Sequence, residues 1–311
     1  MPPRSGCEYK AARQGTDALQ HLANDVVARH YPEATASDRR YRALLGAVIA
    51  RQAGLVARWL GVGVIYGVMN TGHMSITGET IDYGPCAFMD AFHPGRVYSS
   101  IDRGGRYAYG NQPHIAQWNL SRLAQSLLPL LDDEPDKAIE EAQGAIDGFP
   151  ERFEHAYLAC FRAKLGLVEA HEGDAELIDT LLQAMSETGA DFTNTFRALC
   201  DAAEGADGPF RAQLGEAAIL DAWLARWQAR LAQESANSNE RSAVMRRANP
   251  AVIARNHRVE AALDAAVAGD LGPLDALLQA LADPWNERPE ADYYMRPPEP
   301  HEVVQQTFCG T

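Results

Sequence analysis

Apolar residues recur three and four positions apart through most of this chain, and this spacing constrains its fold more than any other feature. The spacing gathers apolar side chains on one face of a helix, where they can be buried together. Ala, Leu, Gln and Arg, which favour helices, are abundant in the same segments. The pattern therefore predicts a mainly α-helical protein, with helices over residues 17–29, 38–60, 112–131, 151–165, 174–187, 209–232 and 257–282.

Local signals refine two of these helices. Trp223 and Trp227 are four residues apart, so they lie on one helical face and are expected to be core or interface aromatic residues. Gly269 is a helix-stop signal inside the 257–282 segment.

One region departs from the helical pattern. Residues 62–83 are rich in β-branched residues and glycine, and Met74 to Asp82 is predicted to form two short strands around a Thr77-Gly78-Glu79 turn. Residues 84–113 follow as a long Gly- and Pro-containing segment without helical periodicity, and loops of this length usually bind a ligand or are disordered. We therefore expect a small β-hairpin at the functional site.

Charge and composition exclude several classes of protein. The net charge of −14 repels nucleic acid, whose binding depends on Lys and Arg neutralising phosphates. No run of about 18 uncharged apolar residues predicts a membrane span, and the first residues lack the apolar core of a signal peptide. The five cysteines form no CxxC pair, so reduced thiols and a cytoplasmic location are expected.

A polar stretch at residues 233–240 predicts a boundary between two parts of the chain, residues 1–235 and residues 236–311. The second part is expected to contain additional helices and a Pro-rich tail.

The window around Asp82 carries the clearest motif. Asp82-Tyr83-Gly84 is similar to the Asp-Phe-Gly magnesium site of kinase-like folds. The preceding Gly67-Val-Met-Asn-Thr-Gly-His-Met-Ser-Ile76 and the following Ile81-Asp-Tyr-Gly-Pro85 resemble the selenoprotein O family, and so do Trp118-Asn-Leu-Ser-Arg-Leu-Ala-Gln125, Arg255-Asn-His257 and Thr307-Phe-Cys-Gly-Thr311.

The resemblance implies a protein-kinase-like (pseudokinase) fold, with residues 1–235 as its C-terminal, catalytic lobe. It also implies a magnesium- or manganese-dependent nucleotidyltransferase, which transfers AMP from ATP to Ser, Thr or Tyr hydroxyls of protein substrates. In the family, three positions form the catalytic centre. Aligned here, Gly72 is the proton-acceptor position, His73 is a metal-binding Asn position, and Asp82 binds metal and nucleotide.

Two of these three positions differ from the family pattern. Glycine cannot accept a proton, so general-base assistance worth about 100-fold or more is lost at position 72. Histidine at position 73 offers nitrogen where Mg²⁺ prefers oxygen. The family's N-terminal lobe, with its Gly-rich loop and strand Lys, is also expected to be absent. The sequence thus predicts a truncated, catalytically impaired adenylyltransferase.

Other interpretations stay open at this point. The chain could be completed in trans by a separate N-terminal lobe or by a second copy, or it could be a non-catalytic interaction protein that self-associates through an apolar patch. Taken alone, Asp82 could be an ordinary turn residue and His73 a solvent-exposed loop residue. Cys309 aligns with the family's selenocysteine position and is either a redox-active thiol or an inert tail residue.

Overall fold

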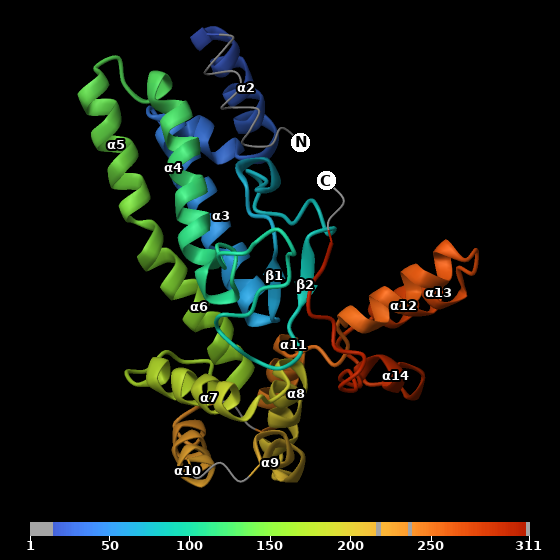
Figure 1. The fold of residues 1–311 in the computed structure, drawn as a ribbon. Helices are drawn as coiled ribbons and strands as arrows, with labels where there is room; N and C mark the ends of the chain where they lie inside the picture. The colour runs from blue at the N-terminus through green and yellow to red at the C-terminus, as the bar shows by residue number, and fades with distance from the viewer. Residues whose placement is uncertain (1–14, 216–218, 236–237, 309–311) are drawn as a thin grey trace. The chain divides into compact units, whose positions relative to one another are not determined.

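The computed structural model describes residues 15–215, 219–235 and 238–308, with the backbone alone described at residues 238 and 239 (Figure 1). The described residues are mainly helical, as predicted. They fall into two compact units. Unit 1 comprises the chain through Arg58 together with Tyr66–Pro85 and Gly110–Tyr157, and unit 2 comprises Trp59–Ile65, Cys86–Tyr109 and the chain from Leu158 onward.

Unit 1 is built from helices around one internal loop that carries the predicted site. Its elements are α2 (Gly15–His30), η1 (Pro32–Ala36), most of α3 (Arg40–Gly61), η2 (Thr71–His73), α4 (Gln112–Leu131), α5 (Pro135–Asp147) and the first part of α6 (Phe149–Leu165).

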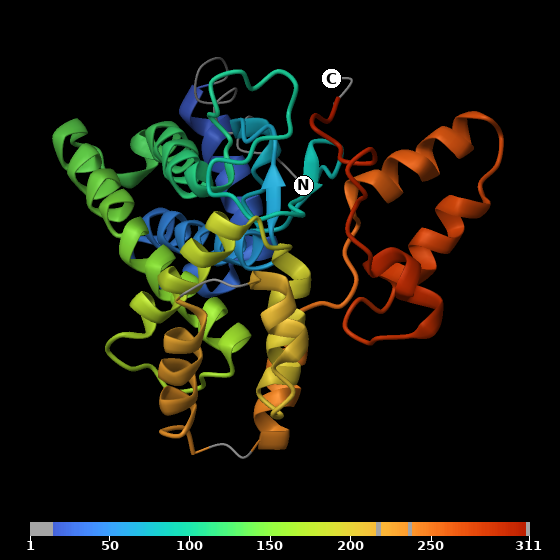
Figure 2. The same cartoon turned by 60° about the horizontal axis from the view of Figure 1, so that its bottom comes forward.

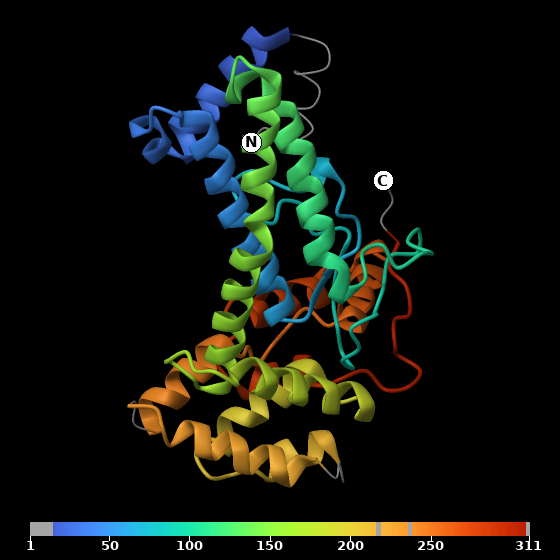
Figure 3. The same cartoon turned by 90° about the vertical axis from the view of Figure 1, so that its left-hand side faces the viewer.

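Helices α4 and α5 form an antiparallel pair joined by a three-residue connection, and they lie side by side in Figure 3. On α5, Ala138, Ala142 and Ile146 are buried at four-residue spacing, so a single stripe of the helix is covered. Small alanine side chains on this stripe allow the two helices to approach closely.

Helix α3 supplies much of the buried apolar surface of unit 1, including Leu45, Val48, Ile49 and Val56. In length and composition it is the one helix among the described residues that could cross a membrane. However, 61% of its apolar window is buried inside the protein, as expected for a core helix.

Unit 2 contains the small sheet and the later helices. Its elements are the first two residues of β1 (Val64–Tyr66), β2 (Cys86–Phe88), the first residue of η3 (Tyr109–Asn111), the rest of α6, α7 (Asp174–Thr188), α8 (Phe192–Ala202), α9 (Gly208–Leu214), α10 (Leu220–Leu231), α11 (Ser238–Ala248), α12 (Asn256–Val267), α13 (Gly272–Leu281), η4 (Pro289–Ala291) and α14 (Asp292–Met295).

The prediction for the two tryptophans of α10 is confirmed. Trp223 and Trp227 are buried and stacked, with ring centroids 5.7 Å apart. Their indole nitrogens donate hydrogen bonds to the carbonyl oxygens of Leu177 and Leu165, so neither polar group is left unpaired in the core.

Two long helical segments are interrupted in the structure. The 257–282 segment forms α12 and α13, which fold back on each other in Figure 2. Gly269 lies between them with φ of +91°, the left-handed conformation that ends a helix. The 209–232 segment likewise forms α9 and α10, and Gly215 follows α9 with φ of +61°.

The predicted β-hairpin at residues 74–82 is wrong. The described sheet instead pairs β1 with β2, and the hydrogen bonds Met89 N to Gly63 O and Gly67 N to Pro85 O show that the strands are antiparallel. The connecting residues, which include 74–82, form a loop with a 3-10 turn.

Side chains explain why residues 74–82 do not form strands. Gln52 and Tyr31 donate to the carbonyl oxygens of Ser75 and Ile76, which a strand would use for pairing. Ser75 Oγ and Thr77 Oγ1 are 2.7 Å apart and bond locally, a known competitor of sheet pairing. Gly78 has φ of +74°, and a Cβ there would lie 2.7 Å from Arg51 Cβ, so the loop packs directly on α3.

Candidate functional site

The 3-10 turn η2 carries two of the predicted site residues, Gly72 and His73. Asn70 caps this turn, because its side-chain oxygen accepts a hydrogen bond from the His73 backbone nitrogen at 3.1 Å. Asn70 was not among the predicted site residues, although an Asn directly before Thr-Gly is a recognisable capping signal. The cap fixes the backbone direction at which the His73 side chain leaves the loop.

Two buried side chains of α4 hold the approach to this turn. Gln112 accepts a hydrogen bond from the Tyr66 backbone nitrogen at 2.8 Å, and Asn119 donates to the Met69 carbonyl oxygen at 2.9 Å. Both amide side chains are fully buried. Because they lie on a regular helix, they give the loop before η2 a rigid support.

The structure brings Asp82 close to His73. Asp82 Oδ1 accepts a hydrogen bond from Gly84 N at 2.9 Å, which forms a tight turn through Tyr83. The other carboxylate oxygen, Oδ2, lies 3.8 Å from His73 Nε2. Both side chains are partly exposed, 37% for Asp82 and 24% for His73, so solvent-borne ligands can reach them.

The His73 ring is oriented by a second contact. Its Nδ1 lies 2.9 Å from the carbonyl oxygen of Val68, and the Tyr66 ring meets it edge-on at a centroid distance of 6.3 Å. The contact between Nδ1 and Val68 therefore orients the imidazole, and Nε2 is the nitrogen that faces Asp82.

The donor set fits a divalent cation, with one carboxylate and one imidazole directed at the same region. Among the described residues, no group of three or more His, Cys, Asp and Glu side chains gathers as a larger metal site. Gly72, between Thr71 and His73, contributes no side chain. The side chains of Asp82 and His73 are thus the metal-ligand candidates at this site, and position 72 offers no proton acceptor.

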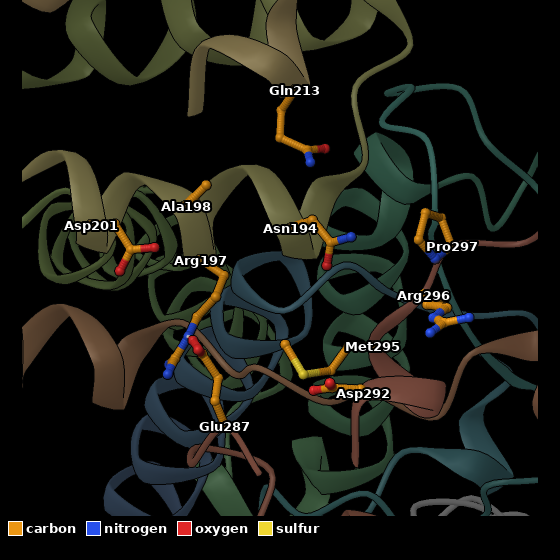
Figure 4. Close-up of a pocket in the computed structure, with 10 residues that line it drawn as sticks. All are labelled: Asn194, Arg197, Ala198, Asp201, Gln213, Glu287, Asp292, Met295, Arg296 and Pro297. Atoms are coloured by element: carbon orange, nitrogen blue, oxygen red, sulfur yellow. The ribbon is translucent and has the colours of Figure 1, made fainter. Parts of the chain in front are cut away.

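A separate hollow of about 400 Å³ lies within unit 2 and holds none of the predicted site residues (Figure 4). Arg197 and Glu287 point toward one another on its wall and form a salt bridge of 2.5 Å. Arg197 also donates to the Asn249 carbonyl oxygen at 3.0 Å. The Arg197 guanidinium thus links α8 to Glu287 and to the Asn249 carbonyl oxygen within unit 2.

The comparison with known families decides the relationship. Residues 6–282 match the family model described as "Protein adenylyltransferase SelO". The chain belongs to the SelO family.

Individual members of the SelO family are similar over nearly the whole chain. The "Protein nucleotidyltransferase YdiU" of Rhizobium etli (strain CIAT 652) is 52% identical over 98% of this chain, and that of Bradyrhizobium sp. (strain BTAi1) is 54% identical over 98%. The aligned part is 61% and 62% of those two relatives. The chain therefore spans about three fifths of their length.

The SelO-matching segment Arg255-Asn-His257 contains a buried ionic cluster that the sequence analysis did not find. Arg255 is fully buried in unit 2 and contacts Asp90 at 2.6 Å and Asp191 at 2.8 Å. It also donates to Asn194 Oδ1 at 3.1 Å and to the Met295 carbonyl oxygen at 2.9 Å. An Arg directly after the apolar run Ala251–Ala254 was the available signal.

Burial acts differently on the members of this cluster. Burial raises the pKa of Asp90, and the adjacent Arg255 only partly counteracts it. Burial alone would lower the pKa of Arg255, but Asp191 and Asp90 reverse this and raise it. The arginine therefore stays charged, and the cluster connects the 84–113 segment, α8 and α14 within unit 2.

Residues of the 84–113 segment and of the C-terminal motif also make local contacts within unit 2. Asp102, in the long segment, accepts hydrogen bonds from the backbone nitrogens of Arg106 and Tyr107, so it shapes its own loop. Thr307, in the SelO-like C-terminal motif, donates from its backbone to the Tyr98 carbonyl oxygen at 2.7 Å. Cys309 lies outside the described residues.

Proposed function

We propose that this chain carries the metal-binding part of a protein adenylyltransferase site, in a protein-kinase-like C-terminal lobe, and that its AMP transfer is impaired at position 72. The observation that supports this most directly is the arrangement around Asp82, whose carboxylate is fixed by Gly84 and faces His73. Membership of the SelO family supports the reaction class.

In the proposed reaction, a Ser, Thr or Tyr hydroxyl oxygen of a protein substrate attacks the α-phosphorus of ATP. The bond from that phosphorus to the bridging oxygen breaks, pyrophosphate leaves, and AMP becomes esterified to the hydroxyl. When bound, Mg²⁺ or Mn²⁺ neutralises charge on the phosphate oxygens. Asp82 would be the main protein ligand of that ion, because the imidazole nitrogen of His73 suits Mg²⁺ poorly.

The hydroxyl proton has no acceptor at position 72. A positioned general base contributes about 10² to 10⁴ in rate, and Gly72 supplies none. The proton would pass to solvent or to a phosphate oxygen, so we expect slow transfer even where ATP and metal bind.

Labelled ATP with Mg²⁺ or Mn²⁺ tests this proposal through AMP incorporation into a carrier protein. The chain is compared with its Gly72→Asp variant, and the Rhizobium etli relative is compared with a variant carrying Gly at the aligned position. We expect the relative to lose about 100-fold or more in rate. Transfer by the unmodified chain at the relative's rate would contradict the proposal, and Asp82→Asn serves as the inactive control.

Exposed apolar residues favour a second candidate, a protein-interaction role for α12 and α13. Leu263, Val267, Leu271 and Leu278 are each more than half exposed, and Val267 is 91% exposed. Sedimentation velocity over a concentration series would detect self-association. A loss of association in Val267→Glu would support this role, whereas a monomer at all concentrations would count against self-association.

We also propose a cytoplasmic location, where ATP and protein substrates are available, for a chain whose similar relatives are bacterial. The prediction that nucleic acid is not a partner rests on the net charge of −14.

A further inference from the structure

His73 is held in the tautomer that a metal ligand requires. The Val68 carbonyl oxygen, 2.9 Å from Nδ1, can only accept a hydrogen bond, so in the neutral ring Nδ1 carries the hydrogen atom and Nε2 carries the lone pair. Histidines that bind metals commonly donate their other ring nitrogen to a carbonyl or carboxylate in this way, which fixes the ring and makes the ligating nitrogen more basic.

The lone pair on Nε2 and the carboxylate of Asp82 are separated by nearly the distance that one metal ion would impose. With metal–ligand bonds of about 2.1 Å, two ligand atoms lie about 3.4 Å apart at a tetrahedral centre and about 3.0 Å apart at adjacent octahedral positions. Nε2 and Oδ2 are 3.8 Å apart. Closure onto a tetrahedral ion needs a movement of about 0.4 Å, half of what an octahedral ion needs.

The surroundings limit how far either ligand can drift from this geometry. The Asn70 cap fixes the backbone of His73, and the Tyr66 ring lies edge-on against the imidazole. Asp82 is fixed through Gly84. A site prepared in this way loses less side-chain entropy when a metal binds.

The ligand chemistry favours a different ion from Mg²⁺. Imidazole nitrogen suits Zn²⁺, Co²⁺ and Ni²⁺, whereas Mg²⁺ requires oxygen ligands and near-octahedral geometry. Among the described residues no third His, Cys, Asp or Glu side chain joins this pair, so His73 and Asp82 are the two acidic or imidazole ligands of the proposed site.

We propose that His73 Nε2 and the Asp82 carboxylate form an open, two-ligand site that prefers Zn²⁺ or Co²⁺ to Mg²⁺. The inference deepens the proposed function, on which it rests for the assignment of Asp82 as the metal-binding carboxylate. The replacement at position 73 then changes the metal that the site selects.

The test uses the chain with CoCl₂, ZnCl₂ and MgCl₂ alone, without nucleotide. Calorimetric titration gives stoichiometry and affinity, and the visible d–d absorption of Co²⁺ reports geometry, since tetrahedral Co²⁺ absorbs much more strongly than octahedral Co²⁺. Cobalt bound by cysteine would be recognised by its sulfur charge-transfer band. We expect one equivalent of Co²⁺ or Zn²⁺ to bind, and Mg²⁺ in large excess not to displace it.

Variants assign the binding to this pair. Both His73→Asn and Asp82→Asn should weaken Co²⁺ and Zn²⁺ binding at least tenfold, and His73→Asn should reduce the preference over Mg²⁺ because it restores an oxygen ligand. The matched control is His171→Asn. His171 Nε2 lies 3.7 Å from Glu169 Oε2, a similar separation to that of the proposed site, but no carbonyl oxygen of the described residues contacts this ring. Its loss should leave the affinity unchanged.

The outcomes separate this inference from the proposed function. If Asp82→Asn weakens metal binding and His73→Asn does not, the metal position of the proposed function stands and the role of His73 is refuted. If neither variant changes binding, or if His171→Asn removes it, the site itself is refuted. Circular dichroism confirms that each variant is folded, which the partial exposure of both ligands favours.

Discussion

Replacing Arg255 by methionine removes the cation that holds two buried carboxylates together in unit 2. The guanidinium is fully buried, and its partners Asp90 and Asp191 are only 14% and 8% exposed. Methionine fills similar volume without charge, so both carboxylates would remain in a low-dielectric environment without their counter-ion.

The structure sets the size of the effect. Removing one partner of a buried ion pair costs about 3–5 kcal/mol, because the other partner stays uncompensated. Domains of ordinary size unfold with about 5–15 kcal/mol, so the variant loses a large part of its stability. With an m-value of about 2 kcal/mol per molar urea, the unfolding midpoint should fall by about 2 M.

Urea unfolding followed by circular dichroism measures this loss. Arg255→Lys is the matched control, because it keeps the charge but loses the fork that contacts Asp90, Asp191, Asn194 and the Met295 carbonyl oxygen, and an intermediate loss is expected. Adding Asp191→Asn to Arg255→Met should restore part of the stability. A loss below about 1 kcal/mol for Arg255→Met would refute the reasoning.

Three further predictions concern other buried groups. Burial lowers the pKa of Lys164 from 10.5 to about 8, so between pH 8 and 10 the unfolded chain binds more protons than the folded chain and the free energy of unfolding should rise with pH. Urea unfolding at several pH values should show this rise, and Lys164→Met should remove it. Burial also lowers the pKa of His257, so stability should fall as the pH drops below 6.5, and thermal unfolding of His257→Phe should show less of this loss. Gly61→Ala would place a Cβ 2.3 Å from Cys160 Sγ and should cost about 1–3 kcal/mol by urea unfolding, whereas the double variant with Cys160→Ala should recover most of it.

Periodicity predicted most helices because their burial is local in the sequence. The positions of α3, α4 and α7 follow from apolar spacing that the structure buries. The loop at residues 74–82 could not be predicted in this way. Its β-branched pattern favours a strand, but Gln52 and Tyr31, more than 20 residues earlier, take the carbonyl groups that pairing would need.

The candidate site was only partly visible in the sequence. The motif located Gly72, His73 and Asp82, but their spacing does not indicate that the imidazole faces the carboxylate or that Val68 orients the ring. The Arg255 cluster was less accessible still, because Asp90 is 165 positions away along the chain. Such long-range pairing depends on the completed fold of unit 2.

The stacked tryptophans of α10 give unit 2 an optical signature of its own. Two indole rings 5.7 Å apart and inclined by 17° couple their electronic transitions, so the folded unit should show an exciton couplet in the far-ultraviolet spectrum that vanishes when the rings separate. Trp223→Phe would abolish the couplet while leaving the four other tryptophans in place. Unfolding of this part of the chain can therefore be followed spectroscopically without attaching a label.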